Sequence, residues 1–493
     1  MPTEEQKPTR TNAEQAAAED RTAVPYSTDY GEPEPEFVGR QPNRYPDKSA
    51  PDAQFVAKQE RWTPDMDGTA DAATGQNRQN GALSADGQRG LTLDFVRGLA
   101  KANDQKSKIV LLVMDGLGGH PQREGGKTEL ETAHTPNLDA LAAQGICGLQ
   151  QPVASGITSG SGPGHLALFG YDPFTYQIGR GALSALGIDF DLQSTDVAAR
   201  GNFCTVDGDG LVTDRRAGRI SSEEGRKLCE LLDQIVIDGV DVTVRHVEEY
   251  RFVLVLRGDN LSADLSDTDP QATGVKPQSA EAKAAGAEQT ARYVTQFLEQ
   301  AKTLLADHEP ANMVLLRGFA QRPNWPSLTD AFHLRAAAIA SYPMYRGVAR
   351  LLGMERLQTT EDIAAKIGVL AEHWSNYDFF FVHVKRTDSA GEDGDFQRKV
   401  QLIEEVDLHI PRLLSLNPDV LIVTGDHSTP AIMQSHSWHP VPVVLWSKIC
   451  RPDEVQRFGE RPCIAGALGP RFPAAELMTL ALANAQRLEK FGA

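Results

Sequence analysis

Acidic and histidine side chains recur in this sequence at the points where apolar runs end. Apolar runs of this kind are typical of buried strands, and open α/β sheets bind ligands at the carboxyl ends of their strands. Asp, Glu and His are common donors to divalent metals. Any one of these residues alone is also compatible with a helix cap or a solvated loop, but three strand ends together favour a metal site. The residues that follow the runs at 109–114, 378–384 and 419–424 are Asp115, Asp388, Glu392, Asp426, His427 and His436.

A second feature is Ser161, which lies in a glycine-rich turn before the apolar stretch HLALFG. A serine at a helix N-terminus sits where backbone N–H groups and the helix dipole favour an anion. A serine that carries a transferred phosphoryl group needs such a place, and it needs a metal or a base that lowers its pKa. Taken alone, the same segment is compatible with an ordinary glycine turn.

The elements that must position these residues form an alternating pattern. Further buried-strand candidates lie at 252–256, 313–316 and 442–446, with helical patterns between them, for example at 279–305 and 395–414. Thr135, Pro136 and Gly145 suit the N-cap, the first turn and the C-terminal end of another helix. Strands that alternate with helices predict an α/β fold with a mostly parallel sheet.

Composition limits the class of protein. The 493 residues include 49 Lys+Arg and 67 Asp+Glu, and the net charge of −18 argues against non-specific nucleic-acid binding. The five cysteines are scattered and form no CxxC motif, which favours a reducing, cytoplasmic location. No apolar run approaches the roughly 20 residues that span a bilayer, so we expect no membrane partner.

The first part of the chain differs from the rest. Nine of the 29 prolines fall within residues 1–66, and no isoleucine occurs before Ile109. Because such a segment cannot offset its ordering entropy by burial, residues 1–88 are predicted to be a disordered extension. A short helix is expected within 91–103.

Several motifs occur together and in order, among them VMDGLGG, TPNLDALAAQG, GSGPGHLALFGYDP, DRRAGRI, LSDTDP, HVKRTDSAGEDGD and VTGDHSTP. In this combination the chain resembles the archaeal type of cofactor-independent (2,3-bisphosphoglycerate-independent) phosphoglycerate mutase, a branch of the alkaline phosphatase superfamily. The resemblance runs from Lys108 to near the C-terminus. It implies a catalytic α/β domain made of residues 89–191 and 343–493, with helices flanking the sheet. An inserted smaller α/β domain, residues 192–342, is expected to act as a substrate-binding lid.

The resemblance also implies a site with two divalent metals. Ser161 matches the phosphorylated serine of the family through its S-x-x-x-H spacing to His165, which is the second candidate catalytic residue. Asp115, Ser161, Asp426 and His427 match the ligands of one metal, and Asp388 and His436 match ligands of the other. Arg346 stands where the family is expected to have a lysine. Candidate substrate-binding residues, each with a surface or interdomain ion pair as the alternative, are Arg180, Arg215, Arg216, Arg219, Arg251 and Arg346.

Glu392 departs from the family pattern, which has a histidine at that position. Three interpretations stay open. Glu392 can itself bind the second metal, which would favour Mn²⁺ or Mg²⁺ over Zn²⁺. Another group, such as His439 or Asp393, can take its place. The second metal can also be lost.

The resulting hypothesis is a metal-dependent phosphoglycerate mutase of glycolysis that interconverts 3-phosphoglycerate and 2-phosphoglycerate through a phosphoserine. Its partner would be a small anionic phosphorylated substrate, and the enzyme would be a monomer or a small homo-oligomer. One alternative is a phosphatase or phosphotransferase that uses the same chemistry on another small phosphorylated substrate. The other is a non-catalytic relative that binds metal or metabolite.

Overall fold

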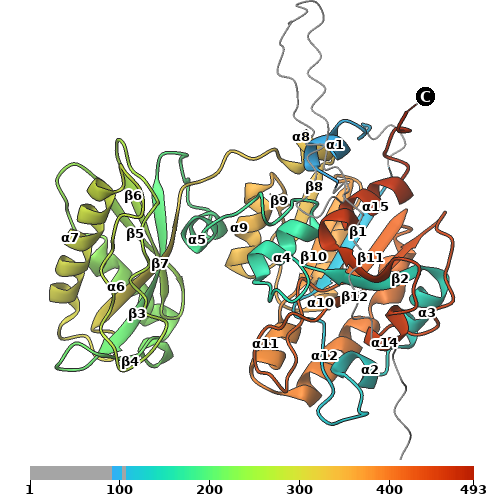
Figure 1. The fold of residues 1–493 in the computed structure, drawn as a ribbon, viewed down its shortest axis with the longest axis horizontal. Coiled ribbons are helices and arrows are strands. Elements are labelled where there is room, and N and C mark those ends of the chain that lie inside the picture. The colour runs from blue at the N-terminus through green and yellow to red at the C-terminus, as the bar shows by residue number, and fades with distance from the viewer. Residues whose placement is uncertain (1–90, 103–106, 493) are drawn as a thin grey trace, which may run out of the picture. The chain divides into compact units, whose positions relative to one another are not determined.

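The strand that directly precedes Asp115 lies inside the larger of two sheets (Figure 1). A computed structural model describes residues 91–102 and 107–492 of the chain, so the extension predicted for residues 1–88 lies outside the described residues. Strand β1 (Ile109–Met114) is buried along its whole length and pairs in parallel with β10 (Phe379–Val384) and with β11 (Val420–Thr424). Because the three strands run in the same direction, their carboxyl ends meet at one edge of the sheet, as the sequence predicts.

The larger sheet is mostly parallel, which confirms the predicted α/β class. Within the described residues it has eight strands in the order β13-β2-β12-β11-β1-β10-β8-β9, and only the β11–β12 and β12–β2 pairs are antiparallel. The strands not yet introduced are β2 (Ile146–Gln151), β8 (Ala336–Ile339), β9 (Glu355–Arg356), β12 (Val441–Ser447) and β13 (Gly469–Pro473).

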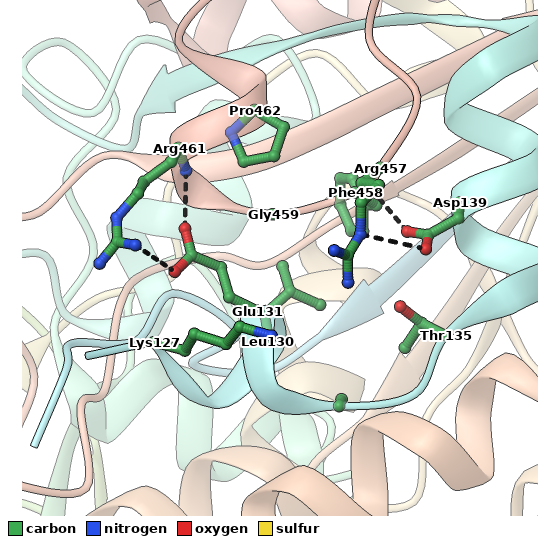
Figure 2. A pocket seen from close by; sticks show the side chains of 11 residues that line it. Lys127, Leu130, Glu131, Thr135, Asp139, Arg457, Phe458, Gly459, Arg461 and Pro462 are labelled. Atoms are coloured by element: carbon green, nitrogen blue, oxygen red, sulfur yellow. Dashed lines mark hydrogen bonds and ion pairs between the residues drawn. The ribbon is translucent and has the colours of Figure 1, made fainter. Parts of the chain in front are cut away.

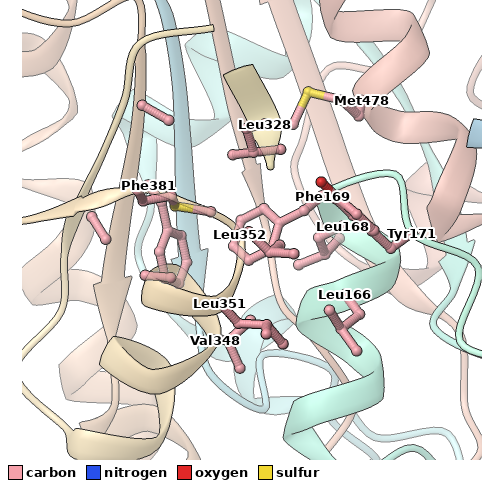
Figure 3. Close-up of a cluster of buried hydrophobic side chains, with 14 of the residues drawn as sticks. Leu166, Leu168, Phe169, Tyr171, Leu328, Val348, Leu351, Leu352, Phe381 and Met478 are labelled. Atoms are coloured by element: carbon pink, nitrogen blue, oxygen red, sulfur yellow. The ribbon is translucent and has the colours of Figure 1, made fainter. Parts of the chain in front are cut away.

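Helices cover both faces of this sheet. Successive side chains of a strand point to opposite faces, so a strand that is buried along its whole length contributes to a core on each side. Ile109, Leu111 and Val113 belong to one buried cluster, part of which is shown in Figure 3, whereas Val110 and Leu112 belong to another. The helices of the first cluster are α1 (Leu93–Arg97), α4 (Ser161–Leu168), α5 (Arg180–Gly187), α8 (Leu328–Phe332), α9 (Pro343–Leu351) and α15 (Leu477–Asn484). The helices of the second are α2 (Glu129–Thr132), α3 (Pro136–Gln144), α10 (Ile363–Glu372), α12 (Phe396–Asp407), α13 (Ile410–Ser415) and α14 (Glu460–Cys463).

The remaining helices are short or belong to the smaller sheet. Helix α11 (Arg386–Glu392) follows β10 directly, and η1 (Ala217–Arg219) and η2 (Ala474–Glu476) are single 3₁₀ turns. None of the helices in the described part of the chain is long and apolar enough to cross a membrane.

The smaller sheet is antiparallel. Its strands pair in the order β4-β3-β6-β5, with β7 on β3, and are β3 (Val197–Val206), β4 (Val212–Asp214), β5 (Asp241–Glu248), β6 (Arg251–Arg257) and β7 (Met313–Ala320). Helices α6 (Ser222–Leu232) and α7 (Glu288–Leu305) pack on one face, where they bury Phe252 and Leu254. On the other face, Ala198 and Val253 share a buried cluster with α5.

The predicted end of the inserted domain needs correction. The strands of the smaller sheet run from residue 197 to residue 320, inside the predicted range of 192–342. However, β8 also falls in that range and pairs with β10 of the larger sheet, from Ala336↔Phe379 to Ile339↔Val382. The boundary at residue 342 is therefore too late. The strand was not recognised in the sequence because the alanine-rich run at 336–340 is short and lacks the bulky residues that marked the other strands. The role of the inserted domain as a lid stays a prediction.

Candidate active site

Four of the predicted side chains converge where β1 and β11 end. We call Asp115, Ser161, Asp426 and His427 the first donor group. The Nε2 atom of His427 lies 3.3 Å from Asp115 Oδ1, 3.3 Å from Asp426 Oδ2 and 3.2 Å from Ser161 Oγ. The two carboxylates and the imidazole are fully buried, and Ser161 is the first residue of α4. The structure thus brings together the set that the resemblance implied for one metal.

The two carboxylates of this group are each satisfied on one side only. Asp426 Oδ1 accepts a hydrogen bond from the Gly116 N–H at 3.1 Å, and Asp115 Oδ2 accepts one from the Tyr345 hydroxyl. Asp115 Oδ1 and Asp426 Oδ2 are buried and accept no hydrogen bond from the described residues. Buried carboxylate oxygens without a partner are costly. Both point to the space in front of His427 Nε2, so the donor set fits a divalent cation.

Three residues that the sequence did not single out surround Asp115 Oδ2. They are Tyr345, His383 with Nε2 at 3.4 Å, and Lys385 with Nζ at 3.2 Å. Although burial raises the pKa of Asp115, the Lys385 ammonium and His383 hold that pKa well below its usual range. Burial lowers the pKa of His383 itself to about 4. Asp115 is therefore kept as a carboxylate, which is the form that binds a cation.

The sequence offers a signal for two of these three residues. His383 and Lys385 lie in HVKRTD, within and directly after a strand that already supplied site residues. Tyr345 lies on α9, directly before Arg346, and no local pattern marks its hydroxyl as a partner of Asp115.

His165 contacts the Ser161 backbone and the Asp426 carboxylate rather than the Ser161 hydroxyl. Its Nδ1 lies 2.8 Å from the Ser161 carbonyl oxygen, one helical turn earlier, and 3.2 Å from Asp426 Oδ2. The hydrogen bond to the carbonyl has the better geometry, and the contact with Asp426 is electrostatic. A catalytic role of His165 stays a prediction, and its contacts suit the orientation of Ser161 and Asp426.

The second donor group consists of Asp388, Glu392 and His436. Asp388 Oδ1 and Glu392 Oε1 lie 3.6 and 3.8 Å from His436 Nε2. Asp388, His427 and His436 offer ligand atoms within 4.8 Å of one another, and Glu392, whose side chain is 54% exposed at the end of α11, is outside that set. Glu392 is thus near enough to join a cation after a small movement but is not held in place for it.

The two residues that were considered as substitutes for Glu392 have other surroundings. His439 Nδ1 lies 2.9 Å from Ser437 Oγ, and its ring packs against Trp438 and His120. Asp393 is exposed. Neither belongs to the groups of possible metal donors in the described residues.

A buried lysine holds together the two loops that carry the first donor group. Lys399 of α12 is fully buried, and its Nζ donates to the carbonyl oxygens of Gly116 at 2.8 Å, Gly118 at 3.1 Å and Thr429 at 2.8 Å. The nearest carboxylate, that of Glu129, is 4.0 Å away. A buried charge is tolerated only with full hydrogen bonding, and here three carbonyl groups supply it.

Four arginines gather on the face of the smaller sheet that α5 covers. Arg200 of β3 stands directly opposite Arg317 of β7, Arg251 lies on β6, and Arg180 begins α5. Like charges directly opposite each other are unfavourable. Burial, followed by the charges of Arg251, Arg180 and Arg317, lowers the pKa of Arg200 to about 10. The Nε atoms of Arg200 and Arg251 are buried and have no hydrogen-bond partner among the described residues. We call these four residues the arginine cluster. Arg251 lies 3.4 Å from Glu248 and Arg317 lies 3.4 Å from Asp269, so part of the charge is matched, and the excess positive charge suits an anion.

The other predicted arginines are placed differently. Arg215 forms a bidentate pair with Asp269, at 2.9 and 2.6 Å, and Arg346 pairs with Asp189 at 3.2 Å. Arg216 and Arg219 are exposed. Of the six predicted arginines, the structure brings Arg180 and Arg251 into the cluster. Sequence reasoning missed Arg200 and Arg317 because each is a single arginine inside a strand pattern.

A separate pocket of about 200 Å³ lies between α2, the start of α3 and the segment at 457–462 (Figure 2). Two ion pairs lie within the pocket: Arg461 lies 3.7 Å from Glu131, and Arg457 lies 3.7 Å from Asp139. None of the predicted site residues lines it, and we assign no role in the chemistry to this pocket.

Comparison with known proteins agrees with the geometry. Residues 142–311 match the family model described as 2,3-bisphosphoglycerate-independent phosphoglycerate mutase. A relative from a Thermotoga species is 50% identical over 392 residues, which are 79% of this chain and 97% of that relative. A relative from Deinococcus radiodurans is 51% identical over 409 residues, 81% of this chain and 99% of that relative. Both carry the name "Probable 2,3-bisphosphoglycerate-independent phosphoglycerate mutase".

Solved structures lead to the same family. A protein from Pyrococcus horikoshii aligns with a TM-score of 0.68 at 31% identity, covering 78% of this chain and 99% of that one. The cofactor-independent phosphoglycerate mutase from Thermoplasma acidophilum aligns with a TM-score of 0.59 at 30% identity, covering 77% of this chain and 100% of that one. The chain therefore belongs to the 2,3-bisphosphoglycerate-independent phosphoglycerate mutase family.

Proposed function

We propose that this chain is a metal-dependent phosphoglycerate mutase that interconverts 3-phosphoglycerate and 2-phosphoglycerate through a phosphoserine at Ser161. The observation that carries the proposal is the position of Ser161 Oγ, 3.2 Å from the His427 Nε2 atom that also lies 3.3 Å from a buried carboxylate oxygen of Asp115 and 3.3 Å from one of Asp426. A serine hydroxyl in such a place has donors around it that can hold a cation and activate it as a nucleophile.

The first donor group would hold one divalent cation, and Asp388, His436 and Glu392 would hold a second. Bound there, the cations would lower the pKa of the serine hydroxyl and neutralise charge on the phosphoryl oxygens. A carboxylate in the place of an imidazole favours a harder ion, so we propose Mn²⁺ or Mg²⁺ rather than Zn²⁺.

The reaction needs no other covalent residue. The Ser161 hydroxyl loses its proton and its oxygen attacks phosphorus, the bond from phosphorus to O3 of the glycerate breaks, and O3 takes up a proton. The bound glycerate then turns, the O2 hydroxyl loses its proton and attacks the phosphoserine, the bond from phosphorus to Ser161 breaks, and the Ser161 oxygen takes up a proton. The two transfers together leave the protonation of the enzyme unchanged. Lys385, whose Nζ lies 3.2 Å from Asp115, places a positive charge beside this centre.

Arginines suit the substrate because their guanidinium groups bind carboxylate and phosphate bidentately. We propose that the arginine cluster, which consists of Arg180 and three arginines of the inserted domain, holds the carboxylate of the glycerate. The inserted domain would then act as a lid that retains the glycerate and excludes water between the two transfers. If water entered, the same phosphoserine would be hydrolysed and the protein would be a phosphatase.

The direct test supplies purified protein with 3-phosphoglycerate and Mn²⁺, Mg²⁺, Co²⁺ or Zn²⁺, and follows 2-phosphoglycerate and free phosphate together. We expect 2-phosphoglycerate without stoichiometric phosphate, and Ser161→Ala should abolish its formation. Phosphate as the main product would favour the phosphatase alternative. No product with any metal, from a protein that still binds metal, would favour the non-catalytic alternative.

The metal preference is tested at Glu392. If Glu392 is a ligand, Glu392→His should move the preference of the enzyme from Mn²⁺ or Mg²⁺ towards Zn²⁺ or Co²⁺, because imidazole is the softer donor. Glu404→His is a control on the neighbouring helix α12, and it should leave the preference unchanged. The same order of metals in wild type and Glu392→His would show that Glu392 does not touch the second cation.

A glycolytic role would place the protein in the cytoplasm. All five cysteines are free thiols in the structure, four of them buried, which suits a reducing compartment. Whether the enzyme acts as a monomer or a small homo-oligomer can be measured by sedimentation.

A further inference from the structure

His427 lies between the two donor groups, and distance alone lets it serve either. Its ligand atoms fall within 4.8 Å of those of Asp115 and Asp426 and also of those of Asp388 and His436. The rings of His427 and His436 stack with centroids 3.6 Å apart. A neutral imidazole has one nitrogen that carries a proton and one with a free lone pair. The position of that proton therefore decides which group His427 can serve.

Thr429 is the residue that fixes this proton. Its Oγ1 lies 2.6 Å from Asp388 Oδ1 and 3.0 Å from His427 Nδ1. An ionised carboxylate only accepts hydrogen bonds, and the Lys385 ammonium contacts the other oxygen of Asp388. At 2.6 Å, two oxygens need a hydrogen between them, so the Thr429 hydroxyl donates to Asp388. The hydroxyl oxygen is then an acceptor for the proton on His427 Nδ1.

This arrangement leaves the free lone pair of His427 on Nε2. That atom faces Asp115 Oδ1 and Asp426 Oδ2, both at 3.3 Å, and Ser161 Oγ at 3.2 Å. We propose that Thr429 is a positioning residue that sets the Nδ1-protonated tautomer of His427 and so commits this histidine to the first donor group. The inference rests on the proposed metal dependence, and it also assigns the second donor group to Asp388, His436 and Glu392 without His427.

The backbone around Thr429 holds the hydroxyl in this place. The Thr429 N–H donates to the carbonyl oxygens of Gly116 at 3.2 Å and Gly118 at 3.0 Å, and the Thr429 carbonyl accepts from Lys399 at 2.8 Å. The side chain is fully buried. One hydroxyl group thus links a ligand of each donor group, and partners of this kind commonly tune metal affinity by about 10- to 100-fold.

The test compares three variants with wild type. Thr429→Val keeps the shape and removes the hydroxyl, Thr429→Ser restores it, and Thr424→Val removes another buried hydroxyl, one that donates to the Pro442 carbonyl at 2.9 Å. Mn²⁺ binding is measured by calorimetry without substrate. We expect Thr429→Val to weaken the binding of Mn²⁺ by about 10- to 100-fold. We expect the Mn²⁺ affinities of Thr429→Ser and Thr424→Val to stay within a few-fold of wild type.

A second measurement reads the tautomer directly in metal-free protein. Nitrogen-15 spectra of histidine-labelled protein, with the His427 signals assigned from a His427→Gln variant, should show a protonated Nδ1 and an unprotonated Nε2. The Thr429→Val spectrum should lose that preference. A protonated Nε2 in wild type, or equal Mn²⁺ affinity in Thr429→Val and wild type, would overturn the inference. Absence of mutase activity together with the expected spectra and affinities would contradict the proposed function and leave the role of Thr429 standing.

Discussion

At the scale of single residues, the site is organised by leaving one oxygen of each buried carboxylate without a partner. Asp115 has Tyr345, His383 and Lys385 around Oδ2, and Asp426 has the Gly116 N–H on Oδ1. The opposite oxygens carry no hydrogen bond in the described structure. The surrounding groups thereby orient each carboxylate so that the other oxygen lies 3.3 Å from His427 Nε2, an arrangement that suits the proposed cation.

Tyr345 gives a prediction about this orientation. Tyr345→Phe removes the hydroxyl that donates to Asp115 and keeps the ring that packs on His383, with centroids 3.8 Å apart. Because Asp115 then turns more freely, we expect Mn²⁺ to bind about 10-fold or more weakly. Calorimetry measures the affinity. Tyr171→Phe is the matched control, since Tyr171 is equally buried and its hydroxyl donates to the Pro326 carbonyl at 2.7 Å, away from the site. Equal Mn²⁺ affinities in the two variants would contradict the orienting role.

The candidate metal ligands of this site were easier to recognise in the sequence than the residues that hydrogen-bond to them. Asp115, Asp426 and His427 were recognisable because polar residues directly after apolar strands share one sheet edge. Tyr345 and Thr429 act through a single hydroxyl each, and a hydroxyl in a helix or loop has no periodic signature. Their roles follow from distances of 2.6 to 3.0 Å around Thr429 and from the contact with Asp115, which only the folded chain creates.

At the scale of elements, three strands of the smaller sheet, β3, β6 and β7, each add one arginine to a shared face. Alternation along the strands places Arg200 and Arg251 beside Ala198 and Val253, on the face that α5 covers, and places Phe252 on the opposite face. Arg200 and Arg317 stand directly opposite each other, which is unfavourable, and the Asp269 carboxylate 3.4 Å from Arg317 offsets part of this repulsion. Pairing of the strands, rather than any local motif, therefore creates the arginine cluster.

This arrangement predicts that Arg200→Gln impairs substrate binding more than turnover. A charge-assisted hydrogen bond is worth about 1.5–3 kcal/mol, so we expect KM for 3-phosphoglycerate to rise about 10- to 100-fold with a smaller change in kcat. Mn²⁺ affinity should stay at the wild-type value. Arg245→Gln, on β5 of the same sheet and paired with Asp233 at the surface, should leave KM unchanged. A loss of kcat at unchanged KM would show that Arg200 does not bind the substrate.

Element boundaries followed from sequence where local signals dominate. Helix α3 begins at Pro136 and is followed by Gly145, as predicted, but the Thr135 side chain makes no capping bond. Asp407 of α12 accepts the N–H groups of Asn137 at 3.3 Å and Leu138 at 2.7 Å instead. A cap supplied from a residue so distant in the sequence cannot be read locally. The end of the inserted domain was misplaced for a related reason, because β8 is recognisable as part of the larger sheet only through its pairing with β10.

At the scale of the whole molecule, a few of the carboxylates that contribute to the net charge of −18 lie at the site. Asp115, Asp388 and Asp426 are fully buried there. Burial and the charge of Asp115 oppose ionisation of Asp426, but His427 and His165 outweigh them and hold the pKa of Asp426 below its usual range. Two divalent ions would add about four positive charges to this region and would let a negative chain attract an anionic substrate. If these carboxylates hold the proposed cations, metal binding would also stabilise the fold.

Removal of metal gives the corresponding prediction for the whole fold. A ligand that binds only the native state stabilises it by about 2.7 kcal/mol per site when its free concentration is about 100 times Kd, so EDTA should lower Tm of the metal-loaded protein by several degrees. Calorimetric scans with EDTA and with Mn²⁺ measure the difference. Asp426→Asn should lower Tm of the metal-free protein, because, despite burial, His427 and His165 hold the pKa of this carboxylate below its usual range and the charged form therefore stabilises the fold. It should also reduce the gain from Mn²⁺. A purely structural Asp426 would lower Tm by the same amount with and without Mn²⁺, whereas a metal ligand lowers Tm more in the presence of Mn²⁺. A gain from Mn²⁺ in Asp426→Asn equal to that of wild type would show that the stabilising cation binds elsewhere.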